Sequence, residues 1–123
     1  EENDDVVVLD GGMGHELKLR GIDDGSFVTG LLANENLLQA STVESIHYDY
    51  LAAGCDVITT NSFVAVPRRM LECGLASNDS DAFHRAAMLI KSSVDRAMAA
   101  VSNFENSNGK GTRQKKMLIL RFE

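Results

Sequence analysis

The chain has 123 residues, which is room for one domain with one modest core. Its composition (44% hydrophobic, 24% charged) is typical of a globular protein, and its net charge of −6 argues against nucleic-acid binding, which needs clustered Lys and Arg. No apolar run approaches the ~20 residues that span a bilayer; the acidic N-terminus and the cysteine count of two predict a reduced, cytoplasmic setting.

The first quarter of the chain predicts a strand followed by a glycine-rich loop. Val6–Leu9 is a β-branched run without alternation, as expected for a strand buried on both faces. Asp10 and three glycines follow at once and begin the loop. A helical turn is expected from Glu16 to Arg20, closed by Gly21, and the stretch from Ile22 to Glu35 is predicted to be irregular.

A helix and a second strand come next. Asn36 is the expected cap of a helix that runs to about Ala53 and ends at Gly54. One apolar stripe with helical spacing supports this helix: Val43, Ile46, Tyr50 and Ala53. Val57–Thr60 is the second β-rich run.

The remainder of the chain predicts two helices and a third strand. Pro67 suits the first turn of a short helix over Arg68–Cys73. The longest helix begins at residue 80 or 81 and ends near residue 101. Residues 102–116 are rich in Ser, Asn and Gly and are predicted to form a flexible connector, before a third apolar run at Met117–Leu120.

This order of elements predicts an α/β fold with parallel strands. Right-handed crossovers place the strands side by side with the helices outside them. A closed barrel of eight such units needs about 250 residues. We therefore expect residues 1–123 to form one partial domain, the first three βα units of a truncated (β/α)8 barrel. Its open strand edges favour self-association or pairing with a partner chain.

Polar groups follow both of the first two predicted strands. Asp10, Gly11 and Gly12 follow the first, and Thr60 and Asn61 follow the second. Since strand ends meet at one edge of a parallel sheet, a carboxylate and exposed N–H groups there can hold the ammonium and carboxylate of an amino acid. The alternative is structural: the glycines merely turn the chain, and the Thr, Asn and Ser side chains bond local backbone.

Other kinds of site are disfavoured. Leu17 stands where a dinucleotide-binding glycine fingerprint needs a small residue, which disfavours nucleotide binding. His47 and His84 lie in predicted helices, where a surface or half-buried histidine is expected. Cys55 and Cys73 lack zinc-like spacing and a histidine partner, so neither a metal site nor a cysteine nucleophile is predicted.

Three segments in order resemble the homocysteine S-methyltransferase family. LDGGMGHEL, starting at Leu9, resembles the family opening DGGMGTEL. IHYDYLAAGCDVITTNSF, starting at Ile46, resembles the segment that ends AGADVITTNTF, and PRRMLECGL, starting at Pro67, is similar to the PRRL-type helix that follows it. The resemblance covers about residues 5 to 76.

This resemblance implies a (β/α)8 barrel that transfers a methyl group from S-methylmethionine or S-adenosylmethionine to homocysteine, giving methionine. The family binds the substrate thiol as thiolate on a zinc ion held by three cysteines. Asp10, Gly11, Gly12, Thr60 and Asn61 match family residues that line the homocysteine pocket. They are expected to position substrate, and no residue of this chain is assigned a catalytic role.

Several positions depart from the family pattern. His15 replaces a small hydroxyl residue, Cys55 replaces alanine, and the chain has no Trp. Residues 118–123 replace the glycine-containing end of the family's third strand. The family's zinc ligands lie on later strands, so the isolated chain is expected to be inactive. The alternative is a non-catalytic barrel remnant that binds a partner chain.

Overall fold

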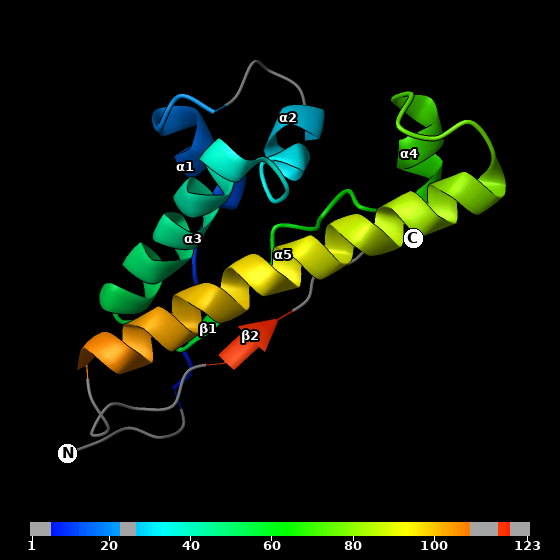
Figure 1. The fold of residues 1–123 in the computed structure, drawn as a ribbon. Helices are drawn as coiled ribbons and strands as arrows, with labels where there is room; N and C mark the ends of the chain where they lie inside the picture. Colours follow the sequence, from blue (N-terminus) through cyan, green and yellow to red (C-terminus); the bar gives the residue numbers. More distant parts are fainter. Residues whose placement is uncertain (1–5, 23–26, 109–115, 119–123) are drawn as a thin grey trace.

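The computed structural model describes residues 6–22, 27–108 and 116–118 (Figure 1). The helices and strands are, in chain order, α1 (Met13–Leu19), α2 (Phe27–Leu32), α3 (Leu37–Ala52), β1 (Val57–Thr59), α4 (Pro67–Glu72), α5 (Asp79–Asn108) and β2 (Lys116–Leu118). Within these residues, none of the helices combines the length and the apolar character that a bilayer crossing requires. The chain is thus a mixed α/β protein, and its described part does not close into a barrel.

The strands run parallel, as predicted. β1 pairs with β2, with Val57 opposite Lys116 and Thr59 opposite Leu118. Along the other edge of β1, Leu9 forms a parallel bridge with Val57. The Asp56 N–H also donates to the Val8 carbonyl oxygen at 2.7 Å. The carboxyl ends of these two extended segments therefore lie side by side, and Asp10 and Thr60 follow them there.

The predicted burial of the first strand is wrong. Val6, Val7, Val8 and Leu9 are between 47% and 61% exposed, and only Leu9 takes part in a bridge. Its side chains are largely exposed, and the backbone contact that fixes its direction is the parallel bridge to β1. A run without alternation therefore identified an extended segment but not its surroundings.

Buried apolar clusters fasten the helices to the strands. Leu51 of α3, Ile58 of β1 and Phe104 of α5 belong to one cluster, so α3 and α5 pack on the face of the sheet that carries Ile58. A second cluster joins α2, α4 and α5 through Leu31 and Leu89. Figure 1 shows α5 running the length of the molecule, with α3 beside one half of it and α4 beside its beginning.

Local sequence signals set the helix ends. The Asn36 side-chain oxygen accepts hydrogen bonds from the Leu38 and Gln39 N–H groups at 2.9 and 3.1 Å, which confirms the predicted cap of α3. The ends of α1, α3 and α4 are followed by glycines with positive φ, a conformation that other residues rarely adopt: Gly21, Gly54 and Gly74.

Helical bounds differ from the prediction in several places; α1, for example, begins at Met13 rather than Glu16. The supposedly irregular stretch from Ile22 to Glu35 contains α2, because Leu31 (3% exposed) is anchored in the cluster with α4 and α5. The predicted connector, residues 102–116, begins inside α5, which continues to Asn108 because Phe104 is buried against β1. β2 begins one residue earlier than predicted; residues 109–115 and 119–120 lie outside the described residues.

The prediction that His47 lies at the surface or half-buried is also wrong. Its side chain is 0% exposed, and neither ring nitrogen has a hydrogen-bond partner among the described residues. His47 lies one turn before Leu51, which is buried in the core between α3 and β1. Burial disfavours the charged imidazolium and lowers the pKa of His47 to about 4.

Candidate functional site

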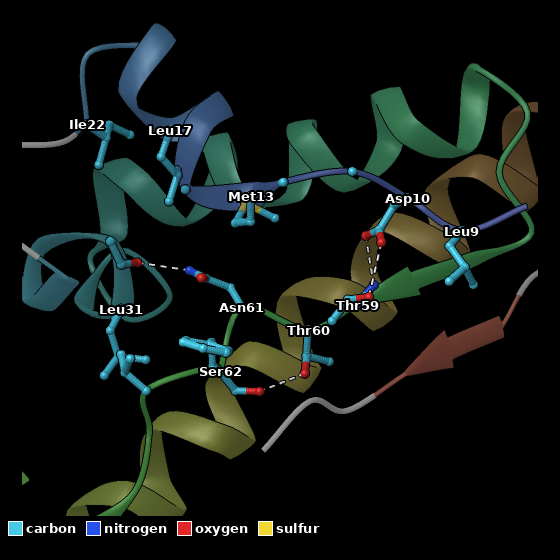
Figure 2. A pocket seen from close by; sticks show the side chains of 16 residues that line it. Leu9, Asp10, Met13, Leu17, Ile22, Leu31, Thr59, Thr60, Asn61 and Ser62 are labelled. Carbon is cyan, nitrogen blue, oxygen red and sulfur yellow. Dashed lines mark hydrogen bonds between the residues drawn. The ribbon is translucent and has the colours of Figure 1, made fainter. Parts of the chain in front are cut away.

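A pocket of about 560 Å³ lies where the first extended segment and β1 end. All five predicted site residues line it, although they come from segments about fifty positions apart: Asp10, Gly11, Gly12, Thr60 and Asn61. Figure 2 shows Asp10 and Thr59 at one end and Leu17, Ile22 and Leu31 at the other, with Asn61 between them. The pocket thus has a polar end and an apolar end.

The Asp10 carboxylate is held by Thr59. One oxygen accepts a hydrogen bond from the Thr59 N–H at 2.8 Å, and the other accepts from the Thr59 hydroxyl at 3.0 Å (Figure 2). An ionised carboxylate has about four lone-pair sites, so acceptor capacity remains after these two bonds. Asp10 is the only charged residue among the described residues that line the pocket. The polar end therefore favours a ligand with a cationic or hydrogen-bond-donating group.

The glycine loop lies close to α3. The Tyr50 hydroxyl donates a hydrogen bond to the Gly12 carbonyl oxygen at 3.0 Å. A Cβ atom at Gly11 would lie 2.8 Å from the Tyr50 hydroxyl oxygen, which is closer than real Cβ contacts. Gly11 is therefore required by this close approach, while its main chain still faces the pocket. The close approach supports the structural interpretation of this glycine, and its place in the pocket lining is compatible with the functional one.

Thr60 and Ser62 form a buried hydroxyl pair at the end of β1. Their oxygens are 2.8 Å apart and hydrogen-bonded, and the residues are 3% and 0% exposed (Figure 2). Both line the pocket. Each hydroxyl can donate and accept, so the pair can turn one hydrogen-bonding atom toward a ligand without leaving its partner unbonded.

Asn61 is tied to a residue that sequence reasoning missed. Its side-chain amide donates to the Gly30 carbonyl at 2.9 Å and to the Asn34 side-chain oxygen at 3.3 Å. In return, the Asn34 amide donates to the Asn61 carbonyl at 2.7 Å and to the Leu31 carbonyl at 3.0 Å. Asn34 is 2% exposed. This reciprocal pair holds α2 against the end of β1.

The described residues do not supply a metal site. They contain no group of three or more His, Cys, Asp or Glu side chains that could hold a metal ion. Cys55 is buried before β1 and Cys73 lies after α4, and neither lines the pocket. The donor set of this site is one carboxylate, hydroxyls, an amide oxygen and main-chain groups, which suits hydrogen bonding to a small polar molecule.

Comparison with protein families and curated proteins gives a consistent result. The family described as homocysteine S-methyltransferase matches residues 7–117. Homocysteine S-methyltransferase 4 of Zea mays is 30% identical over 106 residues, which are 85% of this chain and 30% of that protein. Homocysteine S-methyltransferase 1 of Arabidopsis thaliana is 30% identical over 101 residues, 80% of this chain and 28% of that protein. The chain thus spans about 30% of the length of these relatives.

Comparison with solved structures gives the same result as the comparison with curated proteins. The metallated form of the homocysteine methyltransferase MmuM from Escherichia coli superposes with a TM-score of 0.73 at 26% identity, over 97% of this chain and 38% of that one. Its oxidized form superposes equally well at 24% identity and supports the fold. Nearly the whole of this chain therefore corresponds to a part of those structures.

Proposed function

Since the chain belongs to the homocysteine S-methyltransferase family, we propose that its pocket is the homocysteine-binding part of a methyl-transfer site. The observation that carries this proposal is the convergence of the five predicted residues on one pocket: Asp10, Gly11, Gly12, Thr60 and Asn61. If these residues served only to form local turns, there would be no reason for two distant segments to bring a carboxylate, hydroxyls and main-chain groups to the same cavity.

The chemistry of the pocket matches an amino acid with a short aliphatic chain. The Asp10 carboxylate attracts the ammonium group, and the main chain of Gly11 and Gly12 together with the Thr60 hydroxyl bonds the polar head. The apolar end, formed in part by Leu17 and Leu31, accommodates the aliphatic chain. These residues bind and orient the substrate, so they act on affinity and geometry rather than on proton transfer.

The complete reaction needs more than this chain. We propose a (β/α)8 barrel in which these residues form the first units, with S-methylmethionine or S-adenosylmethionine as methyl donor and methionine as product. A zinc ion that activates the homocysteine thiol needs ligands that the described residues lack. Since the chain spans about 30% of its relatives, we expect no methyl transfer by the 123-residue chain alone.

The experiment that tests this role is a titration of the isotopically labelled 123-residue chain with L-homocysteine, followed by NMR. Homocysteine should shift the amide resonances of Gly11, Gly12 and Asn61, and L-alanine, which lacks most of the aliphatic chain, should shift them less at equal concentration.

The matched variants are Asp10→Asn and Asp95→Asn. Asp10→Asn removes the charge that faces the pocket and should weaken binding about tenfold or more, the size of a hydrogen bond to a charged group. Asp95→Asn removes an equal charge on the exposed surface of α5 and should bind as the unaltered chain does. Equal binding by both variants would refute a role for Asp10 in substrate recognition.

A second candidate function is a non-catalytic barrel fragment that pairs with another chain. The observation in its favour is the exposed apolar segment Val6–Leu9 at the edge of β1. Exposed strands with apolar side chains favour pairing with another chain. The two candidates are separable, because homocysteine binding and association depend on different residues.

A further inference from the structure

Tyr50 contacts the glycine loop that lines the pocket. It lies on α3 and is not one of the residues that line the cavity. Its ring packs against two apolar clusters, one that contains Leu17 and Ile46 and one that contains Leu51 and Ile58. A ring held between two clusters has little freedom, so the position of its hydroxyl is fixed by the core.

The Tyr50 hydroxyl fixes the orientation of one peptide unit in the loop. It donates to the Gly12 carbonyl oxygen at 3.0 Å, and the structure has no cis peptide bonds among its described residues. In a trans peptide the C=O and N–H point in opposite directions. Holding the Gly12 oxygen toward α3 therefore turns the N–H of Met13 away from α3.

Among the described residues, Tyr50 is the side chain from α3 that contacts both glycines of the loop. Gly11 and Gly12 are adjacent, and glycine has access to more backbone conformations than any other residue. The loop is anchored before Gly11 by Asp10, whose carboxylate is bonded twice to Thr59. On its other side Gly12 is the N-cap of α1, and the Tyr50 hydroxyl holds the Gly12 carbonyl from α3. The two glycines therefore lie between two restrained points.

We propose that Tyr50 is a positioning residue whose hydroxyl fixes the glycine loop in the conformation that presents its main chain to the pocket; the consequence for ligand binding rests on the proposed homocysteine site. Gly11 fits this role, because any side chain there would displace the hydroxyl from its 2.8 Å approach. Burial and the negative charges of Glu16 and Asp10 raise the pKa of Tyr50, so the hydroxyl stays protonated as a donor at neutral pH.

The test compares Tyr50→Phe with Tyr48→Phe in the full 123-residue chain. Both changes remove one phenolic hydroxyl from α3 and keep the ring, but the Tyr48 ring packs edge-on against Phe104 rather than against the loop. The first readout is NMR relaxation of the Gly11, Gly12 and Met13 amides without ligand. In Tyr50→Phe their order parameters should fall from the rigid range, about 0.85, toward the flexible range, below about 0.6.

The second readout is homocysteine affinity, measured as a dissociation constant. Tyr50→Phe should weaken it about 3- to 10-fold, the equivalent of one neutral hydrogen bond, whereas Tyr48→Phe should leave both readouts unchanged. Unaltered loop relaxation in Tyr50→Phe overturns the proposal, and so does a mobile loop with undiminished affinity. If the unaltered chain does not bind homocysteine, the proposed function fails, and the relaxation measurement still decides whether Tyr50 fixes the loop.

Discussion

At the scale of single residues, the polar groups of the pocket are each engaged by a neighbour before any ligand arrives. Thr59 holds Asp10, Ser62 holds Thr60, and Asn34 holds Asn61. Such pairing restricts side chains that would otherwise lose conformational freedom on binding. The two interpretations that the sequence left open are therefore compatible, because the bonds that shape the loops also orient the groups that line the cavity.

His47 makes stability depend on pH. Its pKa is about 4 in the folded chain against 6.5 for an exposed histidine, so below pH 6.5 the unfolded state binds a proton that the folded state does not. The stabilising contribution of the neutral, buried ring is complete above pH 6.5 and is lost as the pH falls toward 4. We predict a loss of about 1 kcal/mol in the free energy of unfolding between pH 7 and pH 5.5.

Urea unfolding across this pH range provides the measurement. His47→Leu should remove the pH dependence, while His84→Leu, which changes an exposed histidine of α5, should retain it. A loss of stability that persists in His47→Leu would assign the effect to other groups.

Sequence reasoning could find the residues that face the pocket but not those that hold them. Asp10 and Thr60 directly follow strand-like runs, and strand ends converge whatever the details of packing. Tyr50 was placed correctly on an apolar stripe, yet periodicity identifies the buried face of a helix and says nothing about where a hydroxyl points. Asn34 lies in a stretch without periodicity, so no local signal marked it as buried.

At the scale of elements, helix ends were predictable where a local signal sets them and not where distant contacts do. Asn36 and Gly54 fix the ends of α3 through caps that a sequence displays. The existence of α2 and the last turns of α5 depend instead on the burial of Leu31 and Phe104 in clusters built from other segments. Those clusters are a tertiary property, invisible in a window of neighbouring residues.

The link between α2 and β1 yields a prediction at this scale. Asn34→Ala removes the three hydrogen bonds that the Asn34 side chain makes and leaves the Asn61 carbonyl without its 2.7 Å donor, whereas the Leu31 carbonyl keeps the backbone N–H of residue 34. Stability should fall by about 1–3 kcal/mol, the usual cost of an unsatisfied buried polar group. Homocysteine affinity should fall as well, because Gly30, Leu31 and Asn61 all line the pocket.

Asn103→Ala is the matched control for this prediction, since it makes the same change on the exposed side of α5. Its unfolding curve in urea should be close to that of the unaltered chain. If Asn34→Ala were no less stable than Asn103→Ala, the amide pair would not be what joins α2 to the end of β1.

At the scale of the whole molecule, the described residues form one layer of helices on one face of a narrow parallel sheet. Ile58 faces α3 and α5 and is 0% exposed, whereas Val57 and Thr59 on the opposite face are partly exposed. The matched region is 30% of the maize relative and 38% of the MmuM chain, so both proteins are considerably longer than this one. The barrel expected from the sequence thus stays a proposal. The parallel strands and the helices packed beside them, which such a barrel would contain, are present.

The exposed segment beside β1 gives the last prediction. Val7 is 56% exposed on this segment, and pairing of the segment with a second copy of the chain would cover it. We predict that the 123-residue chain self-associates with rising concentration in sedimentation velocity, and that Val7→Lys shifts it toward the monomer. Leu37→Lys is the control, because Leu37 is 94% exposed but lies at the start of α3, away from the sheet. An equal shift by both variants indicates general hydrophobic association and contradicts pairing through this segment; a shift by Val7→Lys alone identifies the segment beside β1 as the association surface.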